Sequence, residues 1–162
     1  MGVIGMGNIG KRVAKIAEAF GMEVCYYSTS GTSHCTEYPS LSLEELLRTS
    51  DVVSIHAPLN ERTAGLIGKN ELEMMKEAAL IVNMGRGGIV DEAALAEAIN
   101  EGKIAGAALD VFVKEPTPAD NPLLHVKYPE RLRLAPHVAW ASEEARRRLV
   151  QQVADNIGQC IK

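Results

Sequence analysis

Short apolar runs alternate with amphipathic segments from one end of the chain to the other. Runs rich in Val, Ile, Leu and Ala predict strands, over residues 1–4, 23–27, 52–55, 79–82, 104–109 and 132–134. Apolar residues spaced three and four apart predict helices, over residues 8–20, 43–48, 70–76, 92–100 and from 143 towards 161. Because strands that alternate with helices form parallel sheets, the pattern predicts an α/β fold: a doubly wound parallel sheet with helices on both faces.

Polar residues at the expected helix ends support these boundaries. Gly21 follows the first helix at a position that suits the left-handed conformation of a C-terminal cap. Ser42 and Glu45 have the spacing of a capping box, and Asp91 and Ser142 are suitable N-cap residues for later helices. Since no repeat, linker or low-complexity tract interrupts this order, a single domain over residues 1–162 is expected.

Two stretches depart from the alternation. Residues 110–131 contain four prolines and no helical period. Residues 83–90, "NMGRGGIV", contain three glycines directly after a predicted strand. Long irregular loops in compact domains are often functional, and ligands of open α/β sheets bind outside the carboxyl ends of the strands. Both stretches are therefore expected at a binding site.

A glycine-rich motif, Gly5-Met6-Gly7-Asn8-Ile9-Gly10, joins the first predicted strand to the first predicted helix. In this context Gly5 permits a tight turn, Gly7 lets the backbone approach a diphosphate, and Gly10 lets helix and strand pack closely. Free N–H groups at the helix start, Asn8 and Ile9 included, favour an anion there. The motif predicts a dinucleotide site of the Rossmann type, although a strand–helix turn without a ligand has the same local pattern.

The residue that follows the second predicted strand decides which dinucleotide fits. An acidic residue about 20 positions after the glycines normally binds the adenosine ribose of NAD, but Ser28 occupies this place. Glu23 comes too early and Glu37 too late, and no Arg or Lys between residues 24 and 36 would attract a 2′-phosphate. The groups available there are the hydroxyls of Ser28, Thr29, Ser30, Thr32 and Ser33, together with His34. NAD, NADP or use of both stays open.

Composition excludes several other classes of function. The 162 residues are 46% apolar and 23% charged, with a net charge of −4, whereas nucleic acids and anionic membranes select basic surfaces. No apolar run approaches the about 20 residues of a membrane span. Three cysteines, an odd number, have the spacing neither of a disulfide framework nor of a metal site, so a cytoplasmic protein without a metal is expected.

Five segments together resemble one enzyme family. "GMGNIGKRVA", "SIHAPLNERTAGLI", "LIVNMGRGGIVDEAALAEAI", "AALDVFVKEP" and "APHVAW" occur in the order found in D-isomer-specific 2-hydroxyacid dehydrogenases. The resemblance spans essentially the whole chain and concerns the NAD-binding domain of that family. In those enzymes this domain lies between two halves of a substrate domain, which the chain is expected to lack.

The resemblance implies three catalytic residues. Arg86 matches the arginine of the glycine-rich loop, Glu115 the glutamate of "DVFVKEP", and His137 the histidine of "PHVAW". A guanidinium can hold a substrate carboxylate and polarise the neighbouring ketone. The imidazole would exchange a proton with the substrate oxygen, and the carboxylate would fix its tautomer and favour its charged form.

Further positions match cofactor contacts of the family. One segment after the third strand would line the adenosine side, and a hydroxyl would contact the phosphates. Residues after the fourth strand would pass the nicotinamide ribose, and an aspartate with a nearby backbone group would bind the carboxamide. The residues implied for the adenosine side are His56, Ala57 and Pro58, and the hydroxyl is that of Thr63. Those implied for the nicotinamide ribose are Asn83, Met84 and Gly85, and those for the carboxamide are Asp110 and Ala139.

The implied function is an oxidoreductase that interconverts a 2-keto acid and a D-2-hydroxy acid with NAD or NADP. The segment around Trp140 is similar to glycerate dehydrogenases, also called hydroxypyruvate reductases, so hydroxypyruvate and D-glycerate rank first as substrates. The resemblance also implies a homodimer formed through the nucleotide-binding domain. Two alternatives remain: an NAD-sensing, corepressor-like interaction module, and a cofactor-binding fragment that is inactive alone.

Overall fold

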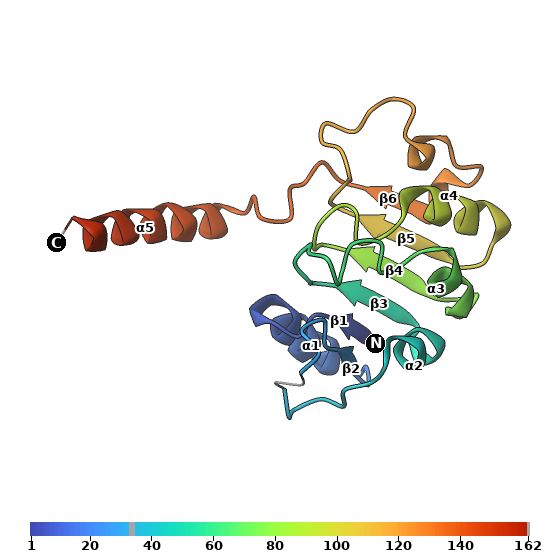
Figure 1. Cartoon of the computed structure of the whole chain (residues 1–162), viewed down its shortest axis with the longest axis horizontal. Helices are drawn as coiled ribbons and strands as arrows, with labels where there is room; N and C mark the ends of the chain where they lie inside the picture. Colours follow the sequence, from blue (N-terminus) through green and yellow to red (C-terminus); the bar gives the residue numbers. More distant parts are fainter. Residues whose placement is uncertain (33–34, 162) are drawn as a thin grey trace.

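A computed structural model describes residues 1–32 and 35–161 of the chain. Its described residues form one parallel six-stranded sheet in the order β2-β1-β3-β4-β5-β6 (Figure 1). The strands are β1 Gly2–Ile4, β2 Cys25–Tyr27, β3 Val52–Ile55, β4 Leu80–Asn83, β5 Gly106–Leu109 and β6 Leu132–Leu134. All six predicted strands are confirmed, and the doubly wound order places the chain reversal between β1 and β3.

Helices connect the strands where the sequence predicts them. They are α1 Asn8–Ala19, α2 Leu43–Thr49, α3 Lys69–Met74, α4 Glu92–Glu101 and α5 Glu143–Cys160. The Ser42 capping box and the Asp91 and Ser142 caps are present as hydrogen bonds. Two short 3-10 helices, Pro122–His125 and Pro129–Arg131, begin at prolines within the long irregular stretch, because proline suits the first helical position.

Helices lie on both faces of the sheet, as predicted. Adjacent residues of a strand point to opposite faces, and in β1 Val3 packs with Ala14 and Ala17 of α1, whereas Ile4 packs with Leu46 of α2. Buried residues of α3 and α4 belong to the same cluster as Ile4. Helix α1 therefore covers one face, and α2, α3 and α4 cover the other.

The main core lies between the sheet and α2, α3 and α4. Burial of such aliphatic side chains stabilises the fold by roughly 1.5–3 kcal/mol for each side chain. The largest fully buried members of this cluster are Ile4, Leu46, Leu47, Ile55, Ile67, Leu72, Ile81, Ile89, Leu95, Ile99 and Ile104.

The α1 face is covered over only part of the sheet. Val3 and Ser54 are buried there, but Leu80 of β4 is 44% exposed and Arg133 of β6 is exposed. Figure 1 shows α5 projecting away from the body of the domain, and none of its described residues is buried. In the described part of the chain, every helix is too short or too polar to cross a bilayer.

The carboxyl ends of the parallel strands meet at one edge of the sheet. Gly5 follows β1, Ser28 follows β2, His56 follows β3, Met84 follows β4 and Asp110 follows β5. Residues from five distant parts of the sequence thus come together where doubly wound folds bind ligands.

Candidate functional site

The glycine loop has a geometry that only glycine permits at two positions. Gly5 has a φ of +93°, and a Cβ there would lie 2.9 Å from the backbone nitrogen of Ala57. A Cβ on Gly10 would collide with the carbonyl oxygen of Gly5. The residue after β1 thus approaches the start of the β3 loop, and the first turn of α1 approaches the end of β1, more closely than any side chain allows.

Gly7 marks open space above the start of α1. A Cβ on Gly7 would meet no described atom within 4 Å, although the residue is the N-cap of the helix. Within the described helix, the first turn has no acidic side chain to offset the helix dipole. Free N–H groups, a positive helix end and open space together fit the diphosphate of a dinucleotide.

A hollow of about 480 Å³ extends from this loop towards Arg86. It brings together residues that follow β1, β3 and β4, most of them predicted as cofactor contacts. The lining residues are Ile9, His56, Ala57, Pro58, Leu59, Met84, Gly85 and Arg86. An elongated ligand whose diphosphate lies at Gly7 can therefore pass between the β3 and β4 loops.

His56, which lines this hollow, has a buried ring nitrogen without a partner among the described residues. Its Nε2 lies 2.9 Å from the Oγ of Ser54, and its buried Nδ1 has no hydrogen-bond partner among the described residues. Burial lowers the pKa of the imidazole, which favours the neutral form. Since buried polar atoms normally have partners, the orphaned Nδ1 is an observation that fits a bound ligand.

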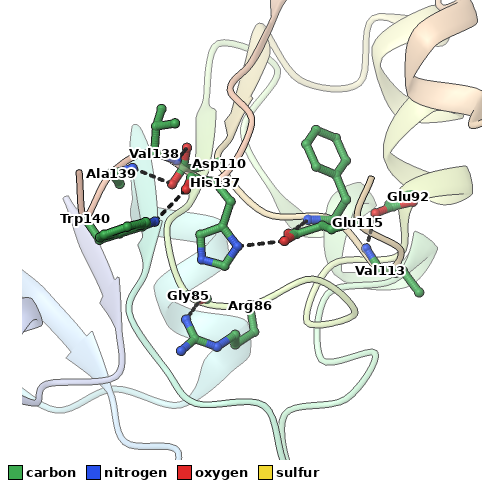
Figure 2. A network of polar contacts seen from close by, with 11 residues as sticks. Gly85, Arg86, Glu92, Asp110, Val113, Glu115, His137, Val138, Ala139 and Trp140 are labelled. Atoms are coloured by element: carbon green, nitrogen blue, oxygen red, sulfur yellow. Dashed lines mark hydrogen bonds and ion pairs between the residues drawn. The ribbon is translucent and has the colours of Figure 1, made fainter. Parts of the chain in front are cut away.

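Glu115 and His137 form a hydrogen-bonded pair. The Nδ1–H of His137 donates to Oε2 of Glu115 over 2.7 Å, and the backbone N–H of Phe112 donates to Oε1 over 2.9 Å (Figure 2). The bond from His137, and then that from Phe112, holds the pKa of Glu115 below its usual value, with a further contribution from the charge of Arg86. Glu115 is thus held as a carboxylate, which fixes the imidazole tautomer with Nε2 facing away.

Arg86 lies beside this pair. Figure 2 shows its guanidinium near the imidazole, where Nη1 donates to the carbonyl of Gly85 over 2.8 Å. The side-chain amide of the buried Asn83 donates to the Arg86 carbonyl and accepts from the Gly85 N–H, each over 3.0 Å. Asn83 therefore shapes the loop from inside, and the guanidinium stays exposed with donors left for a carboxylate.

The two irregular stretches pack tightly against each other. A Cβ on Gly87 would collide with the carbonyl of Phe112, so the loop of Arg86 touches the segment that contains Glu115. This contact brings Arg86, Glu115 and His137 together from positions up to 51 residues apart (137 − 86). Arg86 lines the hollow, and Figure 2 shows the His137 imidazole, bonded to Glu115, near the Arg86 guanidinium.

Asp110 holds the turn that carries His137. The side chain of Asp110 is nearly buried, and its two oxygens accept from the N–H groups of Val138 and Ala139, each over 2.8 Å. His137 itself has a φ of +57°, a conformation that costs energy for a residue with a Cβ. Both Asp110 oxygens accept from backbone N–H groups of this turn, so Asp110 positions His137; its contact with a carboxamide stays a prediction.

Thr63 lies away from the open space. Its side chain has no exposed surface, and its hydroxyl donates to the Pro58 carbonyl over 2.6 Å and accepts from the Asn60 N–H over 2.8 Å. A buried hydroxyl with these partners closes the β3 loop and has no surface left for a phosphate. The expected phosphate contact does not fit this placement.

Glu92 is a positioning residue that the sequence pattern did not indicate. From the first turn of α4 its Oε1 accepts from the Val113 N–H and its Oε2 from the Asn121 side-chain amide, each over 2.7 Å. The two partners lie 21 and 29 residues away in sequence, so no local sequence pattern predicts these hydrogen bonds. Glu92 ties the loop that carries Glu115 to a helix of the core.

Arg62 is a second residue of this kind. Its Nη1 donates to the Ser30 carbonyl over 2.7 Å, across a separation of 32 residues. This guanidinium comes from the loop after β3, outside residues 24–36, which contain no Arg or Lys of their own. The segment of Ser28, Thr29 and Ser30, predicted to face the ribose, thus has a positive charge beside it.

Comparisons with known proteins find matches over most of the chain. A family model described as "D-isomer specific 2-hydroxyacid dehydrogenase, NAD binding domain" matches residues 1–139. A glyoxylate reductase of Aeropyrum pernix is 48% identical over 97% of this chain and 47% of its own length. A glycerate dehydrogenase of Methylorubrum extorquens is 42% identical over 97% of this chain and 48% of its own. The chain spans about half the length of these relatives.

Solved structures share the fold. An acyclic imino acid reductase in complex with NADPH and D-Arg superposes with a TM-score of 0.89, at 33% identity over 99% of this chain and 50% of that one. The NAD complex of a D-isomer specific 2-hydroxyacid dehydrogenase from Lactobacillus delbrueckii gives 0.87, at 31% identity over 98% and 52%. The similar structures thus include one with each dinucleotide.

Proposed function

The chain belongs to the D-isomer specific 2-hydroxyacid dehydrogenase family as its NAD(P)-binding domain, and we propose that it serves an enzyme that interconverts a 2-keto acid and a D-2-hydroxy acid. The observation that carries this proposal is the Glu115–His137 pair with Arg86 beside it. Arg86 lines the hollow next to the glycine loop, and the Glu115–His137 pair lies beside Arg86. Acid–base chemistry next to a dinucleotide site is what such an oxidoreductase needs.

The roles of the three side chains follow from their chemistry. The nicotinamide ring, when bound, supplies or accepts a hydride at the substrate carbon. Nε2 of His137 then holds the proton that the ketone oxygen takes up, and recovers it in the reverse direction. The Glu115 carboxylate stabilises the imidazolium, and the exposed donors of Arg86 bind the substrate carboxylate and polarise the ketone.

Small 2-keto acids are the proposed substrates. We propose hydroxypyruvate first, with D-glycerate as the product, and glyoxylate beside it. The resemblance of the segment around Trp140 to glycerate dehydrogenases supports the first choice, and so does the glycerate dehydrogenase among the similar relatives. The glyoxylate reductase among the similar relatives supports the second.

Turnover by the protein joined to its substrate domain tests this function. With hydroxypyruvate or glyoxylate and a reduced nicotinamide dinucleotide, we expect loss of the dinucleotide absorbance. His137→Gln should lower kcat by about 10²- to 10⁴-fold, the usual contribution of a general acid, without weakening dinucleotide binding. The exposed Lys114→Gln serves as a matched control. No turnover of any small 2-keto acid would contradict the proposal, and cofactor-dependent capture of a protein partner that is indifferent to His137 would favour an interaction module.

The chain by itself should bind a dinucleotide and turn over poorly. A substrate domain that closes over the site excludes water and completes the substrate contacts, and both effects raise the rate. Equal rates for the chain alone and for the longer protein would show that the second domain contributes nothing to catalysis.

We also propose that two copies pair through this domain. The partly covered sheet face near Leu80 and the apolar side chains of α5 support an association surface, because large exposed apolar areas mark interfaces. Light scattering of the longer protein should then give a molar mass twice that of one chain.

A further inference from the structure

A hollow of about 340 Å³ lies next to the end of β2, apart from the catalytic residues. Two segments line it: Thr29 and Ser30 after β2, and Asn60, Glu61 and Arg62 after β3. In doubly wound dinucleotide sites the end of the second strand faces the adenosine ribose. The hollow is therefore where a group attached to the ribose would lie.

Ser28 occupies the position of the missing acid. It follows β2 directly, and its Oγ donates to the Thr32 carbonyl over 2.6 Å and lies 3.1 Å from the Oγ of Ser30. Ser30 also donates to the Thr32 carbonyl, over 3.1 Å. The turn over residues 28–32 thus presents neutral hydroxyl groups, whose O–H can rotate to donate to an anion. It presents no carboxylate that would repel an anion.

Arg62 supplies the positive charge of this hollow. Its guanidinium donates through Nη1 to the Ser30 carbonyl, and its backbone N–H donates to Oδ1 of Asn60 over 2.9 Å. The buried hydroxyl of Thr63 holds the same loop, so the base of Arg62 is fixed while its side chain is exposed. A guanidinium has five N–H donors, and the Ser30 carbonyl takes one of them.

Glu61 is the opposing charge in the hollow. Its side chain is exposed and lies next to Arg62 in sequence, so water screens part of its effect. A ribose 2′-phosphate has about two negative charges and three acceptor oxygens, which match the planar fork of arginine better than they match any neutral group. The balance of charge and geometry in the hollow therefore favours the phosphate.

We propose that Arg62 and the serine-rich turn of residues 28–32 bind the 2′-phosphate of NADP(H), with Arg62 as the residue that sets the preference for NADP(H) over NAD(H). This inference rests on the proposed function, since the same site must hold a dinucleotide. The preferred dinucleotide is then NADP(H). A serine suits the position of the usual acid, because a carboxylate there would repel the 2′-phosphate that Arg62 attracts.

The dissociation constants of NADPH and NADH for the intact chain test the proposal. Wild-type protein should bind NADPH more tightly. Arg62→Gln should weaken NADPH by roughly 10- to 100-fold, the contribution of a charged hydrogen bond, and should change NADH by less than about threefold. Ser28→Asp should shift the ratio in the same direction without touching Arg62. Arg48→Gln, a surface arginine paired with Glu44 on α2, is the matched control.

Each result decides a different statement. Equal weakening of NADPH and NADH by Arg62→Gln would show a merely structural role, and an unchanged ratio in both variants would overturn the inference while dinucleotide binding stands. If the wild-type chain binds neither dinucleotide, the cofactor step of the proposed function fails, and this inference fails with it. Circular dichroism of each variant separates loss of affinity from loss of fold.

Discussion

At His137 the backbone and the side chain depend on different neighbours. Asp110 holds the turn through two backbone bonds, whereas Glu115 holds the imidazole through one. The positive φ of His137 is therefore imposed by the end of β5, and the tautomer by the loop of residues 112–115. The backbone conformation and the ring tautomer of His137 thus depend on separate contacts.

The pKa of Glu115 should respond to His137. The hydrogen bond from His137 is the largest cause of the lowered pKa of this carboxyl, so His137→Ala should raise the pKa towards the usual range of glutamate. A carboxyl with a depressed folded-state pKa stabilises the fold above its unfolded pKa, and this contribution disappears as the pH falls through the folded value. The stability difference between wild type and variant should therefore shrink on acidification.

The carboxyl ¹³C shift of Glu115, followed against pH, measures this prediction. Lys114→Ala removes the neighbouring exposed cation and should leave the titration in place. A titration that is the same with and without His137 would show that the pair does not exist in solution.

Gly7 and Gly10 should respond differently to one added methyl group. Gly10→Ala forces a contact with the Gly5 carbonyl and should destabilise the fold by roughly 1–3 kcal/mol, the usual cost of overpacking. Gly7→Ala adds a methyl to open space at a negative φ, and should change stability by about 1 kcal/mol or less while it weakens dinucleotide binding. Urea unfolding and dinucleotide titration of the two variants separate the effects. Unimpaired binding by folded Gly7→Ala would place the diphosphate elsewhere.

Among the elements, α4 has a function beyond packing. Its inner face buries Leu95 and Ile99, and its first residue, Glu92, binds the irregular loop at Val113 and Asn121. A core helix thereby orients a loop that has little regular structure of its own. Glu92 thus holds the long loop at two points close to Glu115 in sequence.

Glu92→Gln should loosen that loop. The amide keeps one acceptor oxygen and loses the other, so a backbone N–H or an Asn121 donor lacks its partner, at a cost of roughly 1–3 kcal/mol where the group is buried. Amide hydrogen exchange over residues 113–121 should accelerate. Glu101→Gln, at the exposed end of the same helix, is the control and should leave this exchange unchanged. Equal protection in both variants would contradict the anchoring role.

For the molecule as a whole, α5 and the sheet domain are separate in their packing. None of the described α5 residues is buried, while apolar side chains of Leu149, Val150, Val153 and Ile157 are each at least half exposed. The core of the dinucleotide-binding domain therefore forms without any contribution from α5. The exposed apolar side chains of α5 can pack against another surface.

Removal of residues 142–162 should leave the domain intact. Because no core contact within one chain is lost, the melting temperature at concentrations where the chain is monomeric should change by less than about 2 °C, and the dissociation constants of the dinucleotides should stay the same. Calorimetry and titration of the shortened chain measure both. A fall of more than about 5 °C would show that α5 packs on the domain in solution.

The sequence alone determined the order of strands and helices, the glycine loop and the residue types of the candidate site. These features depend on periodicity, capping and backbone freedom over a few residues, so local pattern contains them. Some boundaries moved inward: the expected strand at residues 23–27 begins at Cys25, where pairing with β1 begins. The 3-10 turns of the proline-rich stretch were not expected, since no helical period marks them.

Only the tertiary structure decided which side chains meet. Arg62 reaches Ser30, Glu92 reaches Val113, and the Asp110 oxygens reach the turn of His137, each across more than twenty residues. It also removed Thr63 from the open site by burying its hydroxyl. The physical reason is common to the three long-range contacts: parallel strands bring their carboxyl ends to one edge, and the loops that follow them then share bonds that no local spacing encodes.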